Sequence, residues 1–270
     1  LDALGKEDDA PKLPVIPKTK LGDLYLLGRH RLFCGDATNM KHIQSLMDNQ
    51  MADMIFTDPP YNVDYEGKTE DALKIKNDKM GELEFRDFLQ KVFKNYFAVS
   101  KQGSAIYVCH ADSNGLTFRS TMIEAGWLLK QCLIWVKQHF VMGRQDYHWQ
   151  HEPILYGWVP GAAHRWFGNR KQSTVWQFER PMKSPEHPTM KPVEMIQHAL
   201  SNSSKRDDLV IDFFGGSGST LIACEKTKRR CFAMELDPKY CDVIVTRLET
   251  YSQKKSKRII FLSILCSYIY

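Results

Sequence analysis

Short apolar runs alternate along this chain with stretches of helical periodicity, and no other feature constrains its fold as strongly. The runs Ala52–Thr57 and Ser104–Cys109, for example, each precede a segment with apolar residues at helical spacing. The other predicted strands are Arg31–Cys34, Trp127–Val136, Glu152–Trp158, Leu209–Phe213 and Cys231–Leu236, and the predicted helices are Thr38–Met47, Glu82–Val99, Ser113–Ala125, Val193–Ser201, Thr220–Lys226 and Pro238–Tyr251. This alternation predicts an α/β fold with a mostly parallel sheet and helices on both of its faces.

Ligands of such sheets bind outside the carboxyl ends of the strands, so the residues that follow each strand are the place to search. One predicted strand enters a glycine-rich turn, DFFGGSGST (212–220), that opens a helix. Leu221 stands where a dinucleotide fingerprint has its last glycine, and the turn lacks the GK[ST] of a phosphate-binding P-loop. A nucleotide-like ligand without a pyrophosphate is therefore favoured, and a side chain at Gly218 is expected to occupy its space. A plain strand–helix turn is the alternative.

Two other strand ends carry acidic residues that suit a nucleoside. Glu235 ends the strand that follows the glycine-rich turn, where a carboxylate can accept hydrogen bonds from ribose hydroxyls. Asp36 follows the strand Arg31–Cys34 and can accept a hydrogen bond from an adenine amino group; the alternative is that it caps the helix Thr38–Met47. Asp237 is better interpreted as a helix cap, because a proline follows it at the first helical position.

The fourth unusual strand end is the tetrapeptide DPPY (58–61). Its prolines stiffen the turn and have no N–H group, so the Asp58 carboxylate and the proline carbonyls form a cluster of acceptors. Such a cluster suits an amino group with two N–H donors, and the ring of Tyr61 can stack on a base. A chance Pro-Pro turn is the alternative, and the glycine-rich turn in the same chain counts against it.

These motifs resemble the amino-methyltransferases of DNA that use S-adenosylmethionine, and the resemblance covers residues 22–250. DPPY followed by Asn62 resembles the catalytic motif, the segment 212–218 resembles the cofactor loop, and HPTMKP (187–192) resembles the stretch before that loop. The order of the motifs resembles the circularly permuted β group. The leading segment GDLYLLGRHRLFCGDATN (22–39) resembles modification methylases of phages and prophages.

The resemblance implies a Rossmann-like methyltransferase fold, with a mostly parallel sheet of seven strands, one of them antiparallel. It implies transfer of a methyl group from S-adenosyl-L-methionine to the N6 amine of an adenine flipped out of double-stranded DNA. In that reaction Asp58 and the Pro59 carbonyl accept hydrogen bonds from the two N–H groups of the amine and so orient its lone pair. The residues implied in catalysis are Asp58, Pro59, Pro60 and Tyr61, and those implied in cofactor binding are Asp36, Ala37, Asp58, Thr189, Lys191, Asp212, Phe214, Gly216, Ser217, Gly218, Ser219, Thr220 and Glu235.

The predicted organisation is a linker-like segment (1–21), a catalytic domain (22–252) and a tail (253–270) that is first basic and then apolar. A short insert at about 159–186 is the predicted target-recognition region. Basic residues bind phosphates and neighbouring aromatics can stack on or wedge between bases. The predicted DNA contacts are Asn62, Lys68, Lys137, Arg144, Arg165, Arg170 and Lys171. A homodimer is kept as an alternative to a monomer.

Composition narrows the class of protein. The net charge is +5 (37 − 32), and four cations of the tail account for most of it, so any DNA-binding surface must be local. The chain contains no apolar run long enough to span a bilayer. Its seven cysteines are an odd number without a CxxC pair, which argues against a disulfide framework or a zinc ribbon and for a protein of the reducing cytoplasm. The resemblance implies that this cytoplasm belongs to a prokaryote or a phage-infected host. No metal is expected.

Three other functions stay open at this point. The nearest is an N4-cytosine DNA methylase of the same fold, which analysis of the methylated nucleoside would distinguish. The second is a catalytically weak DNA-binding relative, although the intact Asp58, Tyr61 and Glu235 argue against it. The third is a methyltransferase of RNA or protein. A C5-cytosine methylase is disfavoured, because it needs a cysteine nucleophile, usually after proline, and the chain has no Pro-Cys pair.

Overall fold

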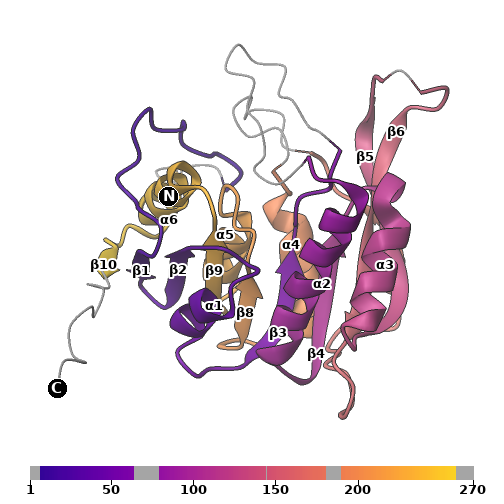
Figure 1. Ribbon diagram of the computed structural model, residues 1–270, viewed down its shortest axis with the longest axis horizontal. Coiled ribbons are helices and arrows are strands. Elements are labelled where there is room, and N and C mark those ends of the chain that lie inside the picture. The colour runs from indigo at the N-terminus through magenta and orange to yellow at the C-terminus, as the bar shows by residue number, and fades with distance from the viewer. Residues whose placement is uncertain (1–6, 64–78, 144, 181–189, 260–270) are drawn as a thin grey trace.

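In the computed structural model, ten strands pair into one sheet in the order β10-β1-β2-β9-β8-β3-β4-β6-β5-β7 (Figure 1). The structure describes residues 7–63, 79–143, 145–180 and 190–259. The strands are β1 (Leu24–Leu27), β2 (His30–Cys34), β3 (Ala52–Thr57), β4 (Ser100–Cys109), β5 (Leu128–Val141), β6 (Trp149–Trp158), β7 (Val175–Gln177), β8 (Leu209–Asp212), β9 (Arg230–Glu235) and β10 (Lys257–Ile259). The helices are α1 (Met40–Met47), α2 (Glu82–Ala98), α3 (Gly115–Glu124), α4 (Val193–Ser203), α5 (Ser219–Lys226) and α6 (Pro238–Ser252).

The seven central strands, β2-β9-β8-β3-β4-β6-β5, match the predicted sheet. All their neighbouring pairs are parallel except those of β6, which runs antiparallel to both β4 and β5. The predicted α/β fold with one antiparallel strand is therefore confirmed. Three short edge strands, which the sequence pattern does not predict, extend this sheet: β1 and β10 at one end and β7 at the other.

Helices cover both faces of the sheet, as Figure 1 shows. One apolar cluster joins the sheet to α1, α2 and α3, and the other joins it to α4, α5 and α6. The central strand β3 is buried over its whole length, and its side chains alternate between the clusters: Met54 and Phe56 belong to one and Ile55 to the other. A strand with two apolar faces is typical of a parallel sheet covered on both sides.

Two helix starts test the predicted caps. The first helix begins at Met40 rather than Thr38, because the side chain of Asn39 accepts a hydrogen bond from the Lys41 N–H (3.0 Å) and caps it. The Asp36 carboxylate instead accepts from the backbone and hydroxyl of Thr38 (2.8 Å each), so the helix-cap alternative for Asp36 is wrong. Asp237 does cap α6, through the Lys239 N–H (2.9 Å), as predicted.

The segment 7–20, within the predicted linker, has no helix or strand but contacts the helices beside it. The Lys18 N–H donates to the Asp242 carboxylate of α6 (2.6 Å), and Asp8 accepts from the Val193 N–H at the start of α4 (3.0 Å). These contacts place the segment against α4 and α6. At the other end of the chain the basic start of the predicted tail forms β10, and its apolar part, 260–270, lies outside the described residues.

Candidate functional site

Three neighbouring strands, β9, β8 and β3, end at the same edge of the sheet with acidic residues. These are Glu235 and Asp212, the last residues of β9 and β8, and Asp58, which follows β3. The crossover from β3 leads away to β4 on one side, and the crossover from β8 leads to β9 on the other. The boundary between β3 and β8 is therefore a point where the strand order reverses, which is where open α/β sheets bind ligands.

The Asp212 carboxylate holds the glycine-rich turn from beneath. One oxygen accepts from the Thr220 hydroxyl (2.7 Å), and the other accepts from the Phe214 N–H (3.1 Å) and the Thr57 hydroxyl (3.3 Å). The side chain is buried, and burial raises its pKa from 3.8 to about 7, because the hydrogen bonds only partly offset the loss of water. Asp212 thus joins β3, β8 and the start of α5.

Glu235 lies directly against the same turn. Its two carboxylate oxygens accept from the N–H groups of Gly216 (2.8 Å) and Asp237 (2.9 Å). Burial raises the pKa of Glu235 to about 7 in spite of these hydrogen bonds. The structure therefore brings Glu235 and the glycine-rich turn together, and the predicted contact of Glu235 with ribose hydroxyls stays a prediction.

The two left-handed glycines of the turn have different surroundings. Gly216 has φ +52°, and a Cβ built on it would meet no described atom within 4 Å. Gly218 has φ +90°, and a Cβ there would lie 3.3 Å from Cγ1 of Ile244 in α6. The expectation that a side chain at Gly218 would fill the ligand's space is therefore wrong. The open position is Gly216, whereas Gly218 allows α5 and α6 to pack closely.

A buried arginine that sequence reasoning missed braces the serines of the turn. Arg247 of α6 donates to the carbonyl of Ser217 (2.9 Å), to its hydroxyl (3.2 Å) and to the hydroxyl of Ser219 (3.3 Å). It also donates to the Glu7 carbonyl (2.6 Å), and burial lowers its pKa to about 10. Its signal in the sequence is its spacing, three residues after the buried Ile244 on the same face of α6. Ser217 and Ser219 are thus already engaged by this guanidinium.

The predicted adenine side of the site lies at the ends of β2 and β8. Asp36 is half-buried in the turn after β2, and Ala37 is buried, with its carbonyl accepting from Asn95 of α2 (2.9 Å). Phe214 is half-buried and packs edge-on against Phe88 of α2, with 6.0 Å between the ring centroids. The Gly35 N–H donates to the Glu235 carbonyl (2.9 Å), which joins this turn to the end of β9.

Four side chains close a ring of polar contacts at the DPPY turn. The Asp58 carboxylate accepts from the Tyr61 hydroxyl (2.5 Å) and from the Lys191 ammonium (2.8 Å). Both donors also lie 3.3 Å from the same oxygen of Glu152, in β6. We call these four residues the polar ring. Pro59 is buried beside it and Pro60 is half-buried.

Burial and ionic contacts act in opposite directions on the acids of the polar ring. Burial raises the pKa of Asp58, with a contribution from the charge of Glu152, while Lys191 opposes the increase. Burial also acts to raise the pKa of Glu152, but Lys191 and Lys137 outweigh it and hold that pKa at about 2. Burial, with the two nearby carboxylates, raises the pKa of Tyr61 well above 10. Glu152 is therefore ionised at neutral pH, and the Tyr61 hydroxyl keeps its proton.

Lys137 is the first predicted DNA contact that the structure places elsewhere. Its side chain is only 9% exposed, and its ammonium contacts Glu152 at 2.5 Å. A buried ammonium that is paired with a carboxylate is not available as a surface contact for phosphate, so this interpretation is corrected. Neither Glu152 nor its pairing with Lys137 was found from the sequence.

Asn62, also a predicted DNA contact, bridges the two ends of the segment 63–79. Its amide donates to the Met80 carbonyl (3.1 Å) and accepts from the Met80 N–H (2.6 Å), while its own backbone has φ +57°. Asn114 donates to the Tyr61 carbonyl (2.6 Å) and fixes the same turn. The structure thus gives the Asn62 side chain a local role. The predicted site residues Thr189, Lys68 and Arg144 lie outside the described residues.

The basic stretch of the predicted insert lies at the opposite edge of the sheet. Arg165 pairs with Asp208, before β8 (2.6 Å), and with Asp53, near the start of β3 (3.3 Å). Arg170 and Lys171 follow it on the same loop and are exposed. The amino ends of the strands meet at this edge, far from Asp58, so the structure places these three predicted DNA contacts away from the DPPY turn.

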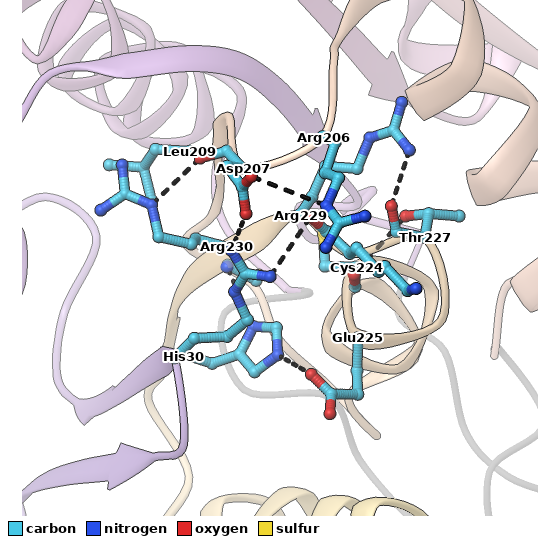
Figure 2. Close-up of polar contacts among 12 residues, drawn as sticks. His30, Arg206, Asp207, Leu209, Cys224, Glu225, Thr227, Arg229 and Arg230 are labelled. Carbon is cyan, nitrogen blue, oxygen red and sulfur yellow. Dashed lines mark hydrogen bonds and ion pairs between the residues drawn. The ribbon is translucent and has the colours of Figure 1, made fainter.

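Figure 2 shows part of this amino edge, where charged side chains of neighbouring loops contact one another. The Arg230 guanidinium donates to the Asp207 carbonyl (3.2 Å), and His30 contacts Glu225 at 2.9 Å. Many cations of this edge therefore already have partners within the fold.

Comparison with known families decides what kind of protein carries this site. The family model of the N6/N4 type, described as DNA methylase, matches residues 52–246. This chain belongs to that DNA methylase family. The match begins at β3 and ends within α6, so it includes the DPPY turn, the glycine-rich turn and Glu235. The narrower resemblance to phage-type enzymes stays a prediction.

Three relatives illustrate the similarity. The Type II methyltransferase M.BglII of Bacillus subtilis is 22% identical, over 89% of this chain and 74% of its own. The DNA adenine methyltransferase YhdJ of Escherichia coli K12 is 24% identical, over 78% of this chain and 80% of its own. The crystal structure of the M1.HpyAVI–SAM complex aligns with a TM-score of 0.61 at 23% identity, over 80% of this chain and 98% of that one. The likeness of the structures confirms the predicted fold.

The family uses S-adenosyl-L-methionine, so the predicted cofactor is confirmed at the level of the family. Among the described residues, no group of three or more His, Cys, Asp or Glu side chains is arranged to hold a metal ion. The described helices also include none that is long and apolar enough to cross a bilayer.

Proposed function

We propose that this DNA methylase transfers the methyl group of S-adenosyl-L-methionine to the exocyclic N6 of an adenine that is flipped out of duplex DNA. The observation that carries the proposal is the position of Asp58. Its carboxylate lies where the strand order reverses, beside the glycine-rich turn, and its side chain remains 25% exposed while the Lys191 that contacts it is buried. A carboxylate fixed in this way can accept a hydrogen bond from an incoming amine.

The proposed chemistry rests on orientation rather than on a covalent intermediate. The lone pair of an exocyclic amine is conjugated with the ring, so the amine is a weak nucleophile. Asp58 and the Pro59 carbonyl accept hydrogen bonds from its two N–H groups. These hydrogen bonds favour a pyramidal nitrogen with its lone pair directed at the sulfonium methyl. As the new C–N bond forms, the S–CH3 bond of the sulfonium would break and the thioether, S-adenosyl-L-homocysteine, would leave. The methylated nitrogen is then acidic, and its proton passes to Asp58 or to water. Tyr61 stacks on the flipped base.

The residues at the ends of β2, β8 and β9 fit the cofactor. Bound S-adenosyl-L-methionine supplies an electrophilic methyl group on a sulfonium. We place its ribose hydroxyls at Glu235, its adenine between Phe214 and the turn of Asp36 and Ala37, and its methionine portion along the open side of Gly216. The last placement is supported by the absence of any described atom within 4 Å of a Cβ built there.

As the surface that binds duplex DNA we propose the hairpin of β5 and β6, which extends beyond the rest of the sheet (Figure 1). Because β6 runs antiparallel to β4, the start of β6 lies at the edge where β3 ends, which is the edge of the polar ring. Several apolar side chains near the tip of the hairpin are exposed: Phe140 by 52%, Met142 by 70% and Tyr147 by 90%. Glu152 of the ring lies three residues after the start of β6 in this hairpin. Exposed apolar side chains of this kind wedge between base steps and help to unstack a target base.

Adenine is favoured over cytosine as the target base by Asp58 itself, since the resemblance associates DPPY with N6 and SPPY with N4 chemistry. YhdJ is described as an adenine methyltransferase. A structure of similar fold is described as the cytosine-N4-specific PvuII enzyme, so the family name alone does not choose the base. We further propose that the protein acts on DNA in a prokaryotic cytoplasm, and the homodimer stays a prediction.

The test is transfer of tritiated methyl groups from S-adenosyl-L-methionine to unmethylated bacterial DNA, followed by separation of the nucleosides. N6-methyladenine is the expected product, and N4-methylcytosine as the sole product would assign the chain to the alternative. The matched controls are Asp58→Ala at the site and Asp207→Ala, which removes an exposed carboxylate at the opposite edge. Transfer should be lost in the first and kept in the second.

A further inference from the structure

Glu152 is the one member of the polar ring that the proposed reaction does not use. Its carboxylate is 19% exposed and contacts two ammonium groups, Lys137 at 2.5 Å and Lys191 at 3.3 Å. With Asp58, the site thus holds two half-buried carboxylates against two buried ammonium groups. Burying charges is costly, and a merely structural need could be met by apolar side chains of similar volume. Retaining the second carboxylate here therefore calls for a reason in the chemistry.

The distances suggest that reason. The Tyr61 hydroxyl and the Lys191 ammonium both contact Asp58 closely, at 2.5 and 2.8 Å, and both lie farther from Glu152, at 3.3 Å. Asp58 is thus the acceptor that these two donors favour in this state. An arriving amine requires acceptor capacity on the same carboxylate, and an ammonium on Asp58 weakens the hydrogen bond that Asp58 can offer. Glu152 is a second carboxylate within reach of both donors.

We propose that Glu152 is a positioning residue that takes over the Lys191 ammonium and the Tyr61 hydroxyl from Asp58 when the target amine arrives. The inference rests on the proposed function. The exchange is a shift of two hydrogen bonds across the polar ring. No covalent bond forms or breaks, and no proton is transferred between the side chains. Lys191 keeps a carboxylate partner throughout, so no buried charge is left unpaired.

Lys137 supports this role from the other side. It contacts the Glu152 oxygen that faces away from the ring, and with Lys191 it keeps the pKa of Glu152 at about 2. Glu152 is therefore an ionised acceptor at neutral pH. The Lys137 ammonium lies 5.2 Å from the centre of the Trp135 ring. This contact limits the movement of the Lys137 side chain toward other partners.

The test compares Glu152→Gln with the double variant Glu152→Gln/Lys137→Met, using steady-state methyl transfer to DNA. In Glu152→Gln we expect kcat to fall about 100-fold, as for a catalytic group held in the wrong place, with little change in KM for DNA. The acidic limb of the pH–rate profile should move to lower pH, because the negative charge of Glu152, which helps to raise the pKa of Asp58, is then absent while Lys191 remains. The other groups near Asp58, Asp212 of β8 and Cys109 of β4, are unchanged.

The double variant restores the balance of charge by removing one ammonium group. We expect it to return the acidic limb toward its original pH while kcat stays low, because the second acceptor is still missing. A double variant with wild-type kcat would show that Glu152 only neutralises Lys137, and an unchanged kcat in Glu152→Gln would equally overturn the proposal. If the single variant does not fold, the kcat of the double variant alone still tests whether Glu152 is needed as the second acceptor. A wild-type protein that methylates no amine in DNA would refute the proposed function instead.

Discussion

Asp212→Asn is expected to remove a pH dependence of stability that the wild-type protein carries between pH 3.8 and about 7. Burial raises the pKa of Asp212 from 3.8 to about 7. As the pH rises through this window, the unfolded chain releases the proton and the folded chain retains it. The free energy of unfolding therefore falls with rising pH, by up to about 4 kcal/mol for a difference of about three pKa units at 1.36 kcal/mol each.

Asparagine suits the contacts of Asp212. Its amide oxygen can accept from the Phe214 N–H, and its NH2 group can donate to the Thr220 hydroxyl, which is able to accept. Because asparagine does not ionise, the variant should be more stable than the wild type above pH 7, by a few kcal/mol, and of similar stability near pH 4.

Urea unfolding between pH 4 and 8.5 measures this difference. Asp207→Asn is the matched control, since it removes an exposed carboxylate at the opposite edge of the sheet. Glu235, whose pKa is also raised to about 7, should leave a smaller slope of the same sign in Asp212→Asn. Parallel curves of unfolding free energy against pH for the wild type and Asp212→Asn would refute the reasoning.

Four further substitutions have outcomes that follow from the site. Asp58→Ala should lower methyl transfer by several orders of magnitude while DNA binding, measured by fluorescence anisotropy, persists. Gly216→Ala and Gly218→Ala share a left-handed backbone that costs about 1–2 kcal/mol, but only the first should also weaken S-adenosyl-L-methionine binding by calorimetry, because its Cβ faces the open side of the turn. Equal losses of affinity would contradict the placement of the cofactor. Arg165→Gln should cost stability, because Asp208 loses its ion pair with Arg165 and Asp53 keeps only the one with Lys101, yet leave the salt dependence of DNA binding unchanged; a reduced salt slope would return Arg165 to the DNA interface.

The parts of the site that the sequence predicts are those built by a single strand and the turn after it. DPPY and the glycine-rich turn each combine a buried strand with residues whose backbone restrictions are visible in the sequence itself. Glu235 and Asp212 follow from the same rule, because the carboxyl ends of parallel strands meet at one edge. Partners from distant segments carry no such local signal. Arg247 reaches the site from α6, and only packing brings it there. Lys191, just before α4, is a site residue that the resemblance implies, but its contact with Asp58 is visible only in the structure.

The two largest errors have one physical cause, the direction of β6. In a parallel strand the residues after the strand lie at the ligand-binding edge, and searching there finds Asp58, Asp212 and Glu235. β6 runs antiparallel to its neighbours, so its first residues lie at that edge and the residues after it lie at the other. Glu152, near the start of β6, therefore belongs to the site although it precedes most of its strand, and Arg165, which follows β6, is carried to the amino edge. The resemblance already implied one antiparallel strand, and assigning that strand to Glu152–Trp158 would have reversed the expected positions of both residues.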